Sequence, residues 1–418
     1  MTRSQVFVNS ILCLVFRGGF FSIHMRFDGL RSQEDILLIK KDILLSPGPT
    51  PIPEESLLEA ARPLIHHRTP EFSQIFMDTI EGLKYVFQTK EDVYPLASSG
   101  TGAMEAAVVN LLCPGDRVLT INGGKFGARW AHICRAYGVD VLEMEVPWGD
   151  VLSKDALEHA MKENPELKAV FSTLCETSTG AVFDIQGYGE VVLRTDAVLV
   201  VDAISGLGAT ACPMDDWKVD VLISGSQKSF MTPPGLAYIA FGSGAGEMIE
   251  RSSLPRFYFD VKAARKALVN RTSPWTPAIS LIRQQKKALD RIRDISLEQL
   301  IEHHRILGEA TRAGIRALDL NLLAKKPGNI LTAVIFPEGI DGFAFIRSMQ
   351  DKYRAYIAGS QEPYKGRFFR IAHLGYMSGY DILTALSAVE MALSDFGFGS
   401  PSGKAVAAAE IILKENWK

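Results

Sequence analysis

The sequence has few cysteines and almost no net charge. Its 418 residues include five widely separated cysteines and no C-x-x-C pair. Such a set argues against a disulfide framework and a zinc cluster and favours a reducing compartment, so we expect a cytoplasmic protein. Lys plus Arg number 45 and Asp plus Glu number 48, giving a formal net charge of −3. A chain this close to neutral has no broad electrostatic attraction to nucleic acid.

The histidines form no metal-ligand pattern. Four of the eight stand in adjacent pairs, His66–His67 and His303–His304. Neighbouring side chains rarely face one ion, so we expect packed or solvated histidines and no metal site.

Long hydrophobic runs are also missing. The apolar run at residues 6–16 (VFVNSILCLVF) is followed at once by Arg17, and it is far shorter than the ~20 residues needed to span a bilayer. It resembles a signal-peptide core but no A-x-A-like cleavage site follows, and Met25 offers another start. We therefore expect no membrane partner. We interpret residues 1–42 as an N-terminal extension that is a disordered arm, a targeting leader or a wrongly assigned start.

What the sequence does contain is an alternation of apolar strands and helical stretches. The runs KAVFSTL, AVLVVDA and DVLISGS, at residues 168–174, 197–203 and 220–226, are short and largely β-branched, which is typical of strands buried on both faces. Alternation with helices predicts an α/β protein whose parallel or mixed sheet is covered by helices. We predict a large domain over residues 43–296 and a smaller C-terminal α+β domain over residues 297–418.

Polar residues stand where these strands end. Asp202 is the next-to-last residue of AVLVVDA, and Lys228 follows DVLISGS between small residues and a double proline. Ligands of open α/β sheets bind beyond the carboxyl ends of the strands. A buried lysine there has a lowered pKa and a nucleophilic amine. Asp202 could equally cap the next helix, and Lys228 could be an ordinary loop lysine.

A candidate anion site precedes a predicted helix. Residues 99–102 read Ser-Gly-Thr-Gly, and free backbone N–H groups at a helix N-terminus attract phosphate. No G-x-G-x-x-G or G-x-x-x-x-G-K-[ST] pattern accompanies it, which removes the main support for a dinucleotide or nucleoside triphosphate. A lysine, a carboxylate and an anion cradle are together what pyridoxal 5′-phosphate requires.

Eight ordered motifs resemble the class V, fold-type I aminotransferases, specifically the alanine–glyoxylate and serine–pyruvate aminotransferase group. The motifs are LLSPGPTPIP, SSGTGAMEAAVVNLLCPGD, INGGKFGARW, ETSTG, VVDAISGLG, SGSQKSFMTPPG, TPAISL and FRIAHLG. The resemblance implies a mostly parallel sheet of the seven-stranded type, a small C-terminal domain and a homodimer with shared active sites.

The resemblance also implies individual roles. Lys228 would form the Schiff base with pyridoxal 5′-phosphate, and Asp202 would face its pyridinium nitrogen. Residues 99–101 would hold the phosphate, with a side-chain donor from Gln227. The complete set of implied cofactor-binding residues is Ser99, Gly100, Thr101, Phe126, Thr177, Asp202, Gln227, Lys228 and Thr276.

The other implied roles concern the ring, the substrate and the partner subunit. Phe126 would stack on the ring, where relatives often have Trp, and Thr177 would bond near the ring hydroxyl. Thr276 would reach the neighbouring subunit's phosphate. Arg370 would bind the substrate carboxylate through both of its oxygens, and Gly48 would lie beside the substrate.

The expected function is a ping-pong transaminase that takes the amino group of alanine or serine to glyoxylate or pyruvate. An acidic donor such as aspartate stays an alternative, since Arg68 could meet a second carboxylate. A lyase or cysteine desulfurase is less favoured, because these enzymes usually have His where Gln227 and Phe126 stand. A non-catalytic accessory subunit is the remaining alternative.

Overall fold

The computed structural model describes residues 41–416. Residues 42–416 belong to one compact unit. The expected N-terminal extension lies outside the described residues, except for Lys41 and Asp42.

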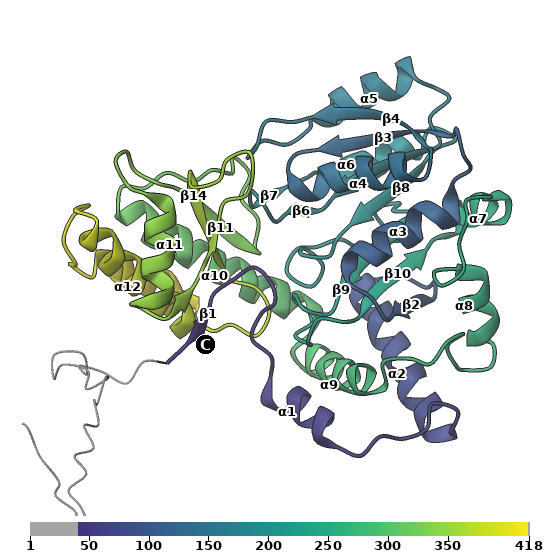
Figure 1. Cartoon of the computed structure of the whole chain (residues 1–418), viewed down its shortest axis with the longest axis horizontal. Helices are drawn as coiled ribbons and strands as arrows, with labels where there is room; N and C mark the ends of the chain where they lie inside the picture. Colours follow the sequence, from purple (N-terminus) through teal and green to yellow (C-terminus); the bar gives the residue numbers. More distant parts are fainter. Residues whose placement is uncertain (1–40, 417–418) are drawn as a thin grey trace, which may run out of the picture. The chain divides into compact units, whose positions relative to one another are not determined.

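A seven-stranded sheet forms the centre of this unit, with the strand order β2-β10-β9-β8-β5-β3-β4 (Figure 1). β10 is antiparallel to its neighbours β2 and β9, and all other neighbours are parallel. The expected α/β class with a mostly parallel sheet is therefore confirmed. The strands are β2 (Val93–Leu96), β3 (Arg117–Asn122), β4 (Asp140–Glu145), β5 (Ala169–Thr173), β8 (Val198–Asp202), β9 (Val221–Gly225) and β10 (Ala237–Phe241).

Alternate residues of these strands pack on opposite faces of the sheet. In β5, Ala169 and Phe171 join a hydrophobic cluster with α3 and α4, whereas Val170 joins another with α2 and α6. Because both faces are covered by helices, the strands read as continuous apolar runs. The helices associated with this part of the chain are α1 (Glu54–Leu58), α2 (Pro70–Phe87), α3 (Gly100–Leu111), α4 (Lys125–Ala136), α5 (Lys154–Glu163), α6 (Ile185–Val192), α7 (Gly246–Arg251), α8 (Val261–Leu268) and α9 (Ile279–Ile295).

A smaller antiparallel sheet, with the order β11-β14-β13, follows later in the chain. The N-terminal arm joins this part, because β1 pairs with β12 in parallel. The strands outside the large sheet are β1 (Ile43–Leu44), β6 (Cys175–Glu176), β7 (Ala181–Val182), β11 (Leu331–Ile335), β12 (Ala355–Tyr356), β13 (Ala358–Gly359) and β14 (Phe368–Ala372). The helices here are α10 (Leu297–Ala317), α11 (Gly342–Asp351), α12 (Gly379–Asp395) and α13 (Lys404–Asn416).

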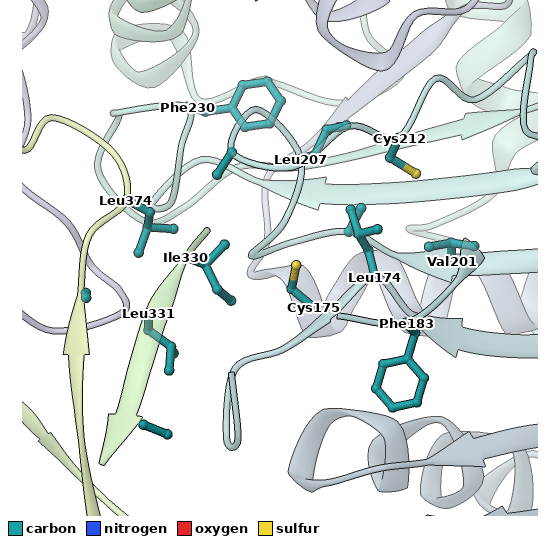
Figure 2. Packing of buried hydrophobic residues seen from close by; sticks show 14 of the residues in the cluster. Leu174, Cys175, Phe183, Val201, Leu207, Cys212, Phe230, Ile330, Leu331 and Leu374 are labelled. Carbon is teal, nitrogen blue, oxygen red and sulfur yellow. The ribbon is translucent and has the colours of Figure 1, made fainter. Parts of the chain in front are cut away.

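One hydrophobic cluster joins the two sheets. Leu174 and Cys175, which follow β5, belong to the same cluster as Ile330 and Leu331 at the start of β11 (Figure 2). This packing holds the carboxyl edge of the large sheet against the later part of the chain. Only Ser296 separates α9 from α10; the expected domain boundary falls at this junction and stays a prediction.

Two further observations concern the described residues. No helix within residues 41–416 has the length and apolar character to cross a membrane. In the same range, no three or more His, Cys, Asp or Glu side chains are grouped so that they could hold a metal ion.

Candidate active site

The candidate site lies at the carboxyl edge of the large sheet. Asp202 is the last residue of β8, and Lys228 follows β9 by three residues. The neighbouring strands are in register here, with Asp202 opposite Thr173 of β5 and Ile223 of β9. Because β5, β8 and β9 are parallel, their ends open on one edge, where α/β proteins bind ligands.

Lys228 is buried, so it is not an ordinary exposed loop lysine. Its side-chain amine donates a hydrogen bond to the carbonyl of Pro47 in the N-terminal arm. Burial lowers the pKa of this amine to about 8; the negative charge of Asp202 opposes the shift, and the positive charge of Arg370 adds to it. The amine is therefore neutral far more often than that of a surface lysine, as a nucleophile requires.

Asp202 is buried beside Lys228. Its Oδ1 accepts a hydrogen bond from the backbone N–H of Ile204 at 2.8 Å. Burial raises the pKa of the carboxyl to about 7, although the Ile204 bond and the charges of Arg129 and Lys228 lower it. The negative charge of Glu176 raises it further. Because burial disfavours the charged form of this carboxyl, a cationic partner beside it would stabilise that form.

Gly48 lies directly against the lysine. Its φ is +140°, a conformation that favours glycine, and a Cβ at this position would overlap with the Lys228 side chain from Cδ to Nζ. Only glycine therefore fits at residue 48, because the lysine side chain occupies the space that a Cβ would need.

Gly48→Ala is expected to lower kcat roughly a hundredfold, because a displacement of a reacting group by about 1 Å can cost that much. Steady-state kinetics of the wild-type and Gly48→Ala proteins would give the change in kcat. Gly115→Ala is the matched control, since Gly115 has a φ of +82° but no atom within 4 Å of an added Cβ. A kcat of Gly48→Ala within threefold of the kcat of Gly115→Ala would contradict the expected displacement of Lys228.

Arg370 comes to the site from β14. Its Nη1 donates to the carbonyl of Thr177 at 2.8 Å, and its Nη2 donates to the carbonyl of Gly359 at 2.7 Å. Burial lowers the pKa of the guanidinium to about 10, and the charge of Glu176 opposes this. The group is thus oriented by backbone carbonyls and still positively charged at neutral pH.

Three of the predicted phosphate residues, Ser99, Gly100 and Thr101, form the N-terminus of α3. Ser99 is the N-cap of α3 and makes no side-chain cap bond. A Cβ at Gly100 would overlap with the Ile204 side chain. The hydroxyl of Ser99 and the first backbone N–H groups of α3 are donors that an anion could accept.

Thr177 and Thr276 differ in their placement. Thr177 is buried and its hydroxyl lies 2.5 Å from that of Ser205. Thr276 is exposed and lines a separate apolar pocket with Tyr258 and Trp275. The structure therefore brings Thr177 to the lysine site by way of Arg370, but not Thr276.

Sequence reasoning missed Glu176, the residue before Thr177. Its carboxylate is buried and accepts hydrogen bonds from the backbone N–H groups of Phe126 and Gly127 at 3.0 and 2.9 Å. It also accepts from the backbone and the hydroxyl of Ser178. Glu176 thus fixes the start of α4, which carries Phe126. The available signal was a carboxylate inside an otherwise uncharged motif, ETSTG.

Sequence reasoning also missed Arg129. Its guanidinium lies 4.7 Å from the centroid of the Phe126 ring, and its Nη1 donates to the hydroxyl of Thr101 at 2.9 Å. The available signal was its spacing from Phe126, because residues three apart share one face of a helix.

The fold and the buried lysine–carboxylate pair define the class of protein, and comparison with known families agrees. The class-V aminotransferase model matches residues 53–344. The chain belongs to this family of aminotransferases, which confirms the resemblance seen in the motifs.

Three named relatives match over most of their length. The chain is 40% identical over 380 residues to a soluble hydrogenase small subunit of Synechococcus, covering 89% of this chain and 98% of that protein. It is 34% identical over 372 residues to an L-aspartate–glyoxylate aminotransferase of Paracoccus denitrificans, covering 87% and 94%. It is 33% identical over 386 residues to a serine–glyoxylate aminotransferase of Methylorubrum extorquens, covering 89% and 96%.

Solved structures are similar as well. A ureidoglycine–glyoxylate aminotransferase from Bacillus subtilis superposes with a TM-score of 0.85 at 28% identity, covering 91% of this chain and all of that one. An alanine–glyoxylate aminotransferase from Nostoc gives a TM-score of 0.82 at 28% identity, covering 89% and all of that chain.

Proposed function

We propose that this protein is a pyridoxal 5′-phosphate-dependent transaminase that moves the amino group of alanine or serine to glyoxylate or pyruvate. The observation that carries the proposal is the buried pair Lys228 and Asp202, whose charges act on each other, with the Arg370 guanidinium close enough for its charge to act on the lysine. Support for glyoxylate comes from the names of relatives, which include a serine–glyoxylate and an L-aspartate–glyoxylate aminotransferase.

The residues present fit the cofactor. Asp202 is a buried carboxylate at the correct edge of the sheet, where a protonated ring nitrogen could donate to it, and the hydroxyl of Ser99 makes no cap bond that would compete with a phosphate. Gly100 begins α3 and packs so closely against Ile204 that a Cβ would overlap its side chain, so only glycine fits at this helix end. Asp202 would hold the ring nitrogen, Lys228 the aldehyde carbon, and Ser99, Gly100, Thr101 and Gln227 the phosphate.

Each catalytic role follows from the environment of the side chain. Pyridoxal phosphate, when bound, supplies an electron sink for the bonds at the α-carbon of an amino acid. The amine of Lys228 would take a proton from the α-carbon and return it, since a pKa of about 8 suits both directions near neutral pH. Arg370 would bind the α-carboxylate and thereby fix the orientation of the substrate.

The substrate assignment follows from the cations of the site. Arg370 provides one carboxylate anchor. Arg68, which could have met a second carboxylate, is exposed. A distal carboxylate would therefore be costly to bury, so small donors are favoured. Aspartate is the second candidate donor, because one relative is named an L-aspartate–glyoxylate aminotransferase.

We expect kcat/KM for alanine or serine to exceed that for aspartate and glutamate at least about tenfold, which corresponds to ~1.4 kcal/mol of transition-state binding. Initial rates with these four donors and glyoxylate decide the matter. A preference for aspartate would contradict the donor assignment and leave the cofactor argument standing. No turnover and no change in the cofactor spectrum with any amino acid would favour an accessory subunit, in line with the hydrogenase-subunit name of one relative.

We also propose a cytoplasmic homodimer with shared active sites. Thr276 would serve the partner's phosphate, and the apolar pocket beside it, lined by Tyr258, Phe259 and Trp275, offers surface for the contact. Phe257 next to this pocket is 77% exposed in the single chain. Sedimentation should give a dimer. A fully active monomer with tightly bound cofactor would contradict the shared site.

A further inference from the structure

Arg129 contacts residues proposed to bind the cofactor, although the proposed function assigns no role to Arg129. It lies on α4, three residues after Phe126. Its guanidinium covers the Phe126 ring at 4.7 Å and donates to the hydroxyl of Thr101 at 2.9 Å. Its charge also acts on the buried carboxyl of Asp202. One cation thus touches or influences residues assigned to the ring, the phosphate and the ring nitrogen.

The contact with Thr101 determines which way the hydroxyl can donate. A guanidinium has only donors, so the Thr101 oxygen must accept from Arg129. The hydroxyl hydrogen is then left for another acceptor. Thr101 is in the first turn of α3, where backbone N–H groups also attract anions. Arg129 therefore prepares Thr101 to donate to an anion at this helix end.

None of the residues assigned to the phosphate carries a positive charge; they are Ser99, Gly100, Thr101, Gln227 and the partner-directed Thr276. A phosphate monoester carries about −1.5 to −2 charges at neutral pH, and a helix N-terminus offers roughly +0.5. A nearby cation would balance much of the remainder.

We propose that Arg129 is a further cofactor-site residue, which supplies the positive charge of the phosphate site and orients Thr101 toward the phosphate. This inference rests on the proposed function. It assigns Arg129 a positioning and charge-balancing role that depends on the phosphate group of the ligand.

The test compares two ligands that differ only in the phosphate. Dissociation constants of pyridoxal 5′-phosphate and of pyridoxal are measured on the cofactor-free chain by quenching of protein fluorescence. Arg129→Met should weaken binding of pyridoxal phosphate roughly 10- to 100-fold, as expected for a hydrogen bond to a charged group. Binding of pyridoxal should change less than about threefold, because it presents no phosphate to this site.

Variants separate charge from structure. Arg135→Met is the matched control, because Arg135 is on the same helix and pairs with Glu143 at 2.7 Å outside the site; it should change neither affinity. Arg129→Lys should recover part of the loss. Combined with Thr101→Val, Arg129→Met should weaken pyridoxal phosphate binding by less than the product of the two single effects, since one acts through the other.

The outcomes are distinguishable. Equal losses for the two ligands in Arg129→Met would overturn the inference and assign Arg129 to packing of Phe126. Unchanged affinity for pyridoxal phosphate would also overturn it, while the proposed function stands. A wild-type chain that binds neither ligand would overturn the proposed function and this inference together.

Discussion

Replacing Lys228 by alanine is expected to abolish transamination, with kcat falling at least roughly a thousandfold, as when a positioned acid–base group is lost. The lysine is buried, and its amine has a pKa lowered to about 8 by that burial. It bonds to the carbonyl of Pro47 and lies against Gly48. Alanine keeps none of these contacts and offers no nucleophile.

Two measurements check this expectation. Borohydride treatment followed by mass spectrometry should find cofactor attached to the wild-type chain and none attached to Lys228→Ala. Lys125→Ala is the control, since Lys125 is an exposed lysine at the start of α4, and it should retain both activity and attachment. Full transaminase activity in Lys228→Ala would remove this residue from the mechanism.

The parts of the molecule that the sequence alone predicted depend on local patterns. Apolar runs ending in Asp202 or preceding Lys228 identify buried strands and their polar ends, because burial on both faces leaves a continuous signal over five or so residues. The parallel α/β sheet follows from the same runs and the helices between them. The placement of Lys228 and Asp202 at one edge was therefore predictable without a relative.

Contacts between distant segments had no such signal. Arg370 donates to the carbonyl of Thr177, 193 positions earlier, and the Lys228 amine donates to Pro47, 181 positions earlier. No periodicity encodes these pairings; only the resemblance to a family could indicate that Gly48 and Arg370 belong to the site. The same limit hid Glu176, whose hydrogen bonds reach across 50 positions to the start of α4.

A second large effect is expected from Asp202→Asn, which should lower kcat by roughly a thousandfold, or about 4 kcal/mol of barrier at ~1.4 kcal/mol per factor of ten. Asparagine is nearly the same size, and its oxygen can still accept the bond that Ile204 donates to Oδ1 at 2.8 Å. The substitution therefore removes the negative charge with little other change. Without that charge, the ring nitrogen of bound cofactor would no longer be held protonated, and the electron sink would weaken.

Asp220→Asn is the matched control for this measurement. Asp220 is partly buried and, like Asp202, accepts a backbone hydrogen bond, in this case from Leu199 at 2.8 Å; burial raises its pKa to about 6. It directly precedes β9, whereas Asp202 ends β8, so the two carboxyls lie at opposite edges of the same parallel pair. Asp220→Asn should leave kcat within about threefold, because it is remote from the reacting atoms. If Asp202→Asn also changed kcat less than threefold, Asp202 would serve only as a cap for the turn that follows β8. The proposal that it holds the ring nitrogen of the cofactor would then be wrong.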